Sequence, residues 1–127
     1  MPKTYYLDDN FINAALRATP YTSPTTVYVA LYTVAPNVGG GGTEVSGGGY
    51  GRQIATFAAP VNGQTSNTTD ITFPVATATW GTIVAFALLD AASGGNMLYF
   101  GNLSTPRTVL VSDQVRFPSG QLLVQET

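Results

Sequence analysis

The hydrophobic positions near the start of the chain follow a helical spacing. In residues 6–18 (YLDDNFINAALRA) apolar side chains recur every three or four residues, at Leu7, Phe11, Ala14, Ala15 and Ala18, which is the spacing of one face of an α-helix. Thr4 or Asp8 is placed to cap its start. Pro20 ends it, because the residue before a proline is pushed out of the helical conformation. We therefore predict a helix and an extended arm that together occupy residues 1–24.

From residue 25 the period changes to two. The stretch 26–33 (TVYVALYT) alternates along its length, and further short segments rich in β-branched and aromatic residues follow at 52–60, 70–80, 82–90, 97–103, 108–111, 113–120 and 121–125. Turn residues separate them every eight to twelve positions or so, which is typical of all-β domains. We predict a single antiparallel β-sandwich or jelly roll of about eight strands over residues 25–127.

Some details of this strand pattern are sharper than others. Residues 82–90 are the most apolar and predict a central strand, and the Asn62-Gly63 pair predicts a hairpin turn. Pro74 predicts a broken or edge-placed strand, because proline donates no ladder hydrogen bond. Two separate strands, 97–103 and 108–111, are predicted on either side of Pro106. The last two segments are expected to pair as a hairpin. Trp80 fits either the core, which we favour, or a seam between subunits.

A glycine-rich loop over residues 39–51 interrupts the strands. Its sequence, GGGGTEVSGGGYG, lacks the G-x-G-x-x-G spacing of a dinucleotide site because Arg52 stands at the last glycine position. It has no lysine, so it is not a phosphate loop either. A loop of this length is expected to be mobile or to lie on a neighbouring molecule.

The composition narrows the possible chemistry. Charged residues make up 9% of the chain, against roughly 25% in an average protein, and the formal net charge is −2. The sequence has no basic cluster for nucleic acid, and we expect neither a secretory signal peptide nor a membrane span. Histidine and cysteine are both absent, which removes the commonest general base and nucleophile. We therefore expect that the protein is not an enzyme and binds no cofactor or metal. The aspartates that flank strands are explained more simply as turn residues.

Aromatic residues outside the strands are better candidates for contact with a partner. Tyr5, Tyr6 and Tyr21 lie in the predicted helix and arm, and Tyr50 and Arg52 lie at the end of the glycine-rich loop. Tyrosine and arginine are enriched at protein interfaces. These five residues form the predicted partner interface.

Several stretches together resemble a family of small bacteriophage virion proteins, often described as tail fibre proteins. They are VALYTVAP, GGTEVSGGGYGRQ, DITFPVATATWG, AFALLDAASGGNMLYFGNL and FPSGQLLV, and their most distinctive part is residues 43–48 with Tyr50 and Arg52. The resemblance covers nearly the whole chain and implies a virion component without catalytic residues.

Two functions follow from the resemblance. The first is a capsid decoration, or cement, protein: a homo-oligomer, expected to be a trimer, that binds the major capsid protein and stabilises the shell through many weak contacts. The alternative is a tail or tail-fibre component that sits among neighbouring tail proteins and recognises a host surface, such as a glycan. Either function places the protein on the virion, at the capsid exterior or the tail.

Overall fold

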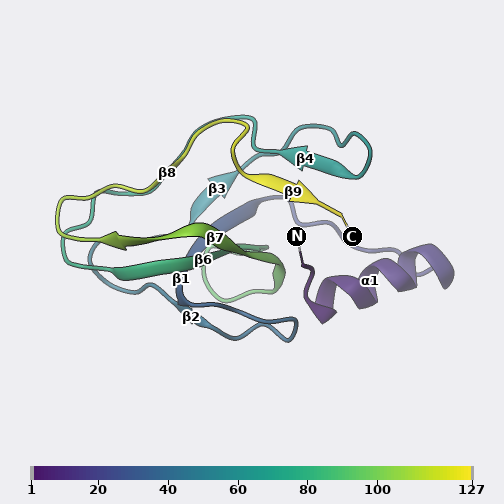
Figure 1. Ribbon diagram of the computed structural model, residues 1–127. Helices are drawn as coiled ribbons and strands as arrows, with labels where there is room; N and C mark the ends of the chain where they lie inside the picture. The colour runs from purple at the N-terminus through teal and green to yellow at the C-terminus, as the bar shows by residue number, and fades with distance from the viewer. Residues whose placement is uncertain (1, 127) are drawn as a thin grey trace.

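The computed structural model describes residues 2–126, which form one helix and nine strands (Figure 1). The helix α1 spans Tyr5–Leu16, within two residues of the prediction at each end. The strands are β1 (Val27–Val34), β2 (Thr43–Glu44), β3 (Gln53–Ala55), β4 (Gln64–Ser66), β5 (Ile71–Thr72), β6 (Gly81–Leu89), β7 (Met97–Val109), β8 (Arg116–Phe117) and β9 (Leu123–Gln125). The protein is thus a small all-β domain with an N-terminal helix. The outer limits predicted for its two parts, residues 1 and 127, lie outside the described residues.

The larger sheet has the order β2-β1-β6-β7, with β3 also paired to β1. All of its pairings are antiparallel. The prediction of a central strand at residues 82–90 is confirmed by β6, which lies between β1 and β7 and is buried along most of its length.

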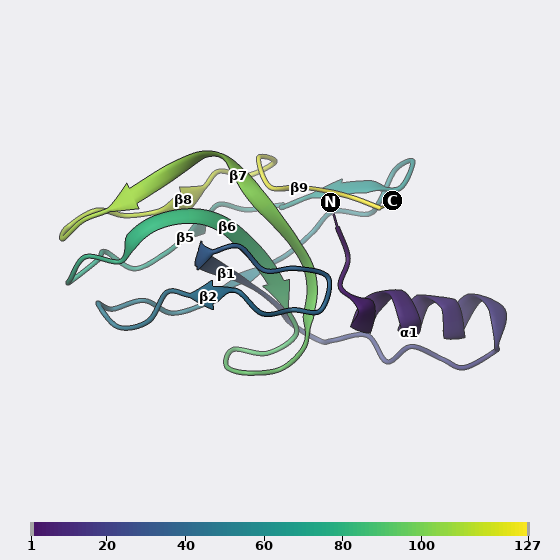
Figure 2. The same ribbon diagram turned by 60° about the horizontal axis from the view of Figure 1, so that its bottom comes forward.

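The second layer consists of two short pairs, β4 with β9 and β5 with β8. These strands lie over one face of the larger sheet (Figure 2). The main core fills the space between the layers and includes Leu31, Leu88, Phe73, Trp80 and Val124. Trp80 is therefore a core residue, 6% exposed, rather than a seam residue.

Two predictions about strands are wrong. The last two segments do not form a hairpin with each other, because β8 pairs with β5 and β9 pairs with β4. Pro106 does not divide two strands: β7 continues through it. The register moves from Ile83↔Arg107 directly to Ala85↔Asn102, so Pro106 lies in a bulge, where a missing donor is tolerated.

The glycine-rich loop is folded on its own chain. It contains β2, and the carbonyl of Gly48 accepts a 2.8 Å hydrogen bond from the Trp80 indole. Gly48 has φ +60°, and a Cβ there would lie 2.9 Å from the Trp80 ring. Glycine is therefore required at this close approach, and the expectation of a mobile or neighbour-bound loop is corrected for this part of the loop.

The helix projects from one edge of the sandwich in both views (Figures 1 and 2). Of the predicted apolar face only Leu7 is buried; Ala14, Ala15 and Ala18 are exposed, and Ala18 lies beyond the helix with φ 54°. The second half of α1 extends past the sheet, so it has little to pack against. Thr4 is at the N-cap position, but its hydroxyl donates to the Met97 carbonyl in β7 and not to the helix.

Candidate functional site

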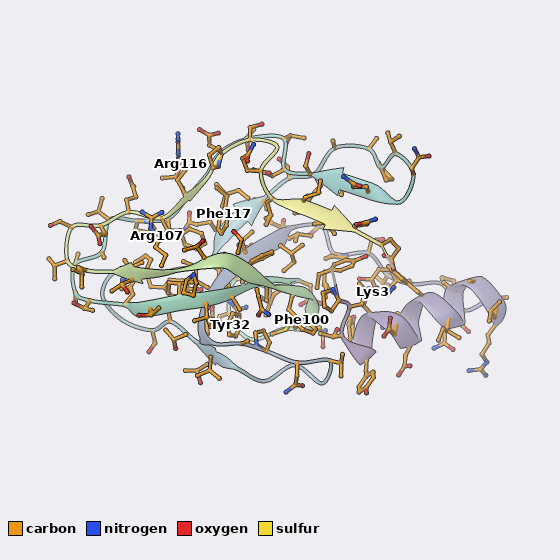
Figure 3. The ribbon with its side chains drawn as sticks, viewed as in Figure 1. Lys3, Tyr32, Phe100, Arg107, Arg116 and Phe117 are labelled. Carbon is orange, nitrogen blue, oxygen red and sulfur yellow. The ribbon has the colours of Figure 1, made fainter. Side chains whose placement is uncertain are left out.

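The two faces of the larger sheet are covered differently. One faces the core; the other, called here the outer face, carries the small side chains of Ala30, Ala85 and Ala87 between Tyr32, Leu89 and Phe100. Figure 3 labels Tyr32 and Phe100 on the lower side of the sheet, opposite Phe117 between the layers. The outer face therefore has shallow positions bordered by aromatic rings.

A cleft of about 510 Å³ opens above part of this face. It lies where the start of α1, the glycine-rich loop and the turn after β6 approach one another. Its lining residues are Thr4, Tyr5, Tyr6, Tyr32, Val38, Gly39, Gly40, Gly41, Arg52, Leu89, Gly94, Gly95, Asn96 and Met97. This size is within the range of small-ligand sites, roughly 300–1,000 Å³.

The N-terminal segment is held against the cleft by backbone hydrogen bonds. The Tyr5 N–H donates to the Val38 carbonyl at 2.8 Å, and the Thr4 N–H donates to the Leu98 carbonyl at 3.0 Å. These bonds place the first turn of α1 between the glycine-rich loop and β7. Both Tyr5 and Tyr6 line the cleft, with exposed fractions of 61% and 38%.

Arg52 forms part of the cleft and is held by several bonds. Its Nε and Nη2 donate to the two carboxylate oxygens of Glu44, each at 2.9 Å. Its Nη1 donates to the carbonyls of Ala91 and Gly94, at 2.8 and 2.9 Å. Arg52 thus ties the glycine-rich loop to the turn after β6 and fixes two walls of the cleft.

Tyr50 connects this group to the core. Its ring lies 5.4 Å from Trp80 in an edge-on arrangement, and its hydroxyl donates to Glu44 at 2.7 Å. The same hydroxyl accepts a 3.0 Å hydrogen bond from the Leu31 N–H. Leu31 lies in β1 between the residues that pair with β2 and those that pair with β3. Burial, and then the bond to Glu44, raise the pKa of Tyr50 far above its usual value, so it stays protonated.

Glu44 accepts hydrogen bonds from both Arg52 and Tyr50. Burial alone would raise its pKa, but hydrogen bonds from Arg52 and Tyr50 outweigh that effect, and the pKa lies below its usual value. Glu44 is therefore ionised near neutral pH, and it neutralises the charge of Arg52.

Tyr32 behaves differently from Tyr50. It is only 4% exposed and lines the cleft. Among residues 2–126 its hydroxyl has no hydrogen-bond partner, yet that oxygen is not sealed from solvent. Burial, followed by the nearby Glu44 carboxylate, raises its pKa. Because the hydroxyl is open to solvent and bonds to none of residues 2–126, it is available to a partner that enters the cleft.

The five residues predicted as a partner interface separate into two groups. Tyr5, Tyr6 and Arg52 come together in the cleft. Tyr21 packs against Phe11 on α1, with ring centroids 5.8 Å apart, and Tyr50 packs in the core; neither lines the cleft. The interface role of all five stays a prediction.

Sequence reasoning missed Tyr32 and Asn96. Tyr32 is an aromatic residue inside a predicted strand, a position that usually belongs to a core, and Asn96 lies in the turn between β6 and β7. The alternation in β1 places Tyr32 on the face of the sheet opposite to that of the core-facing Leu31. Only the folded chain shows that the Tyr32 hydroxyl has no hydrogen-bond partner among residues 2–126.

Residues 2–126 contain no group of three acidic side chains arranged to hold a metal ion. No helix among them has the length and apolar character needed to cross a bilayer.

Comparison with known proteins identifies the family. A family model described as Podophage GP4 fiber I protein gp80 matches residues 2–125, nearly the whole chain. The protein belongs to this family of phage fibre proteins. A search of curated proteins gives no match.

Membership of this fibre family confirms the resemblance to phage virion proteins. The protein is a structural component of the virion, located on its tail or capsid exterior. The family description speaks of a fibre, so it supports the tail-fibre alternative better than capsid decoration.

Proposed function

We propose that this protein is a component of a phage tail fibre that contributes to recognition of the host surface, and that it does so through the cleft. It acts by binding and not by catalysis. Its partners within the particle are further copies of itself and neighbouring tail proteins.

The observation that carries the proposal is the combination of exposed and unpaired groups in the cleft. Tyr5 and Tyr6 present rings at its edge, and the Tyr32 hydroxyl lies inside it without a partner in residues 2–126. Rigid aromatic side chains with a polar tip are effective contact residues, because they bury much area at a low cost in conformational entropy. A surface that works only by packing has no need of a hydroxyl that no described protein group bonds and that solvent can reach.

Competition with the phage for its host tests the proposal. Purified protein, added to host cells before infection, is expected to lower the fraction of phage that adsorbs. The double variant Tyr5→Ser/Tyr6→Ser is expected to lose this effect. The double variant Ile54→Ser/Val61→Ser, which changes two exposed apolar residues outside the cleft, is the matched control and is expected to keep it.

Localisation on the particle supplies the second test. Gold-labelled antibodies against the protein are expected to mark the tail fibres of the virion. Label spread over the shell, together with a higher melting temperature of undecorated capsids after the protein is added, would contradict the proposal and favour decoration.

A further inference from the structure

We propose that the cleft binds an uncharged saccharide and that the Tyr32 hydroxyl bonds to it directly. This inference rests on the proposed function, since it names the class of surface molecule that the cleft would recognise. It depends on three features of the cleft: its charge, its unpaired polar atoms and its shape.

The charge of the cleft argues against an anionic ligand. Arg52 is the one charged residue among those that line it. Its guanidinium is already bonded to Glu44, Ala91 and Gly94. A phosphate or carboxylate would therefore find no free cation, and it would lose hydration without a compensating charge.

The unpaired polar atoms suit hydroxyl groups. Tyr32 offers a hydroxyl that both donates and accepts. Asn96 donates its side-chain N–H to Asp90 at 3.1 Å, and its backbone N–H bonds to the same carboxylate at 2.7 Å. This fixes the amide and leaves its oxygen as an acceptor. A donor and an acceptor that line the same cleft can each bond a hydroxyl of a sugar ring.

The shape of the cleft suits a ring with one apolar face. A pyranose presents C–H groups on its faces and hydroxyls around its edge, and the exposed rings of Tyr5 and Tyr6 offer an apolar surface of that size. Gly39, Gly40 and Gly41 also line the cleft. A Cβ at Gly40 would meet no atom within 4 Å, so the absence of a side chain there leaves the space open to a ligand.

Chemical-shift mapping tests the inference directly. ¹⁵N-labelled full-length protein is titrated with methyl glycosides of glucose, galactose, mannose, rhamnose and N-acetylglucosamine, and with their disaccharides. Glucuronic acid, N-acetylneuraminic acid and glucose 6-phosphate form the acidic arm. At least one neutral saccharide is expected to shift the amides of residues 39–41 and 94–97, and the acidic probes are expected to bind more weakly or not at all.

The variant Tyr32→Phe removes only the hydroxyl. We expect it to weaken saccharide binding about three- to tenfold, the effect of one lost hydrogen bond, with an unchanged melting temperature because no intrachain bond is lost. Tyr28→Phe, in the same strand but outside the cleft, is the matched control and is expected to bind as the wild type does.

Four outcomes would overturn the inference: no shift with any neutral probe, shifts confined to residues away from the cleft, tighter binding of the acidic probes, or unchanged binding by Tyr32→Phe. Adsorption competition separates this failure from failure of the proposed function. If the protein still blocks phage adsorption while neutral saccharides do not bind, host recognition stands and the ligand class is wrong.

Discussion

The two faces of the larger sheet differ in how they treat their polar groups. Between the layers, the Tyr50 hydroxyl accepts a hydrogen bond from Leu31 and donates one to Glu44. The Tyr50 ring packs against Trp80 and Phe73. On the outer face, Tyr32 is buried as completely as a core residue, but its hydroxyl has no partner within residues 2–126. Satisfied polar groups stabilise the fold, whereas an unpaired one keeps its bonding capacity for a ligand. We infer that the first face serves stability and the second serves binding.

The largest effect is expected in the core between the layers. Trp80→Ala removes a buried ring and the indole bond to the Gly48 carbonyl. We expect a loss of about 3–5 kcal/mol in the free energy of unfolding, the usual cost of such a cavity, measured by urea denaturation. A loss below about 1 kcal/mol would mean that Trp80 does not anchor the glycine-rich loop.

The next largest effect on stability comes from removing one tyrosine hydroxyl on each face of the larger sheet and comparing the two losses. Tyr50→Phe leaves the Leu31 N–H without its acceptor and removes one of the two donors to Glu44 Oε2, which Arg52 still bonds. It should cost about 1–3 kcal/mol. Tyr32→Phe, by the same chemistry, should change stability by less than about 0.5 kcal/mol. Equal losses in urea denaturation would contradict the division of roles between the faces.

Acid sensitivity tests the chain of bonds that joins the two faces. The pKa of Glu44 is lower in the folded protein than its usual value of 4.5, so its contribution to stability is present above pH 4.5 and is lost as the pH falls through the folded value. Glu44→Gln should lower stability by about 1 kcal/mol near neutral pH, after allowance for partial exposure.

The difference between the wild type and Glu44→Gln should then shrink as the pH falls below 4.5. Glu126, whose pKa is also lowered, is present in both proteins, so its effect cancels in the comparison. A difference that is constant with pH would show that the carboxylate charge is not what holds Arg52.

The smallest effect on stability is expected on the projecting helix. Ile12 and Leu16 are 52% and 80% exposed on α1. The double variant Ile12→Ser/Leu16→Ser should change the free energy of unfolding of the monomer by less than about 0.5 kcal/mol per site. If the predicted self-association uses this surface, sedimentation velocity will show weaker oligomers. Unchanged association would exclude the surface formed by Ile12 and Leu16 as the contact between copies.

Much of the fold could be predicted from local pattern. The alternation in residues 26–33 and the apolar run of 82–90 appear as β1 and β6, and Asn62-Gly63 forms the expected two-residue turn, with positive φ at both positions and a Val61↔Gln64 bridge. The pairings of β8 with β5 and β9 with β4 could not be predicted, because their partners lie more than 40 residues away in the sequence. Period two tells which side chains share a face but not which strand lies beside it.

The sequence by itself determined what kind of protein this is. Absent histidine and cysteine, few charges and short alternating segments are local properties, and they predict a small β domain without evident catalytic groups. The likeness to phage virion proteins came separately, from stretches such as residues 43–48 with Tyr50 and Arg52. Only the tertiary structure decided that Tyr5, Tyr6, Tyr32, Arg52 and Asn96, from separate segments, line one cleft. The physical reason is that periodicity reports burial within an element, whereas an unpaired hydroxyl depends on every neighbour that the folded chain brings to it.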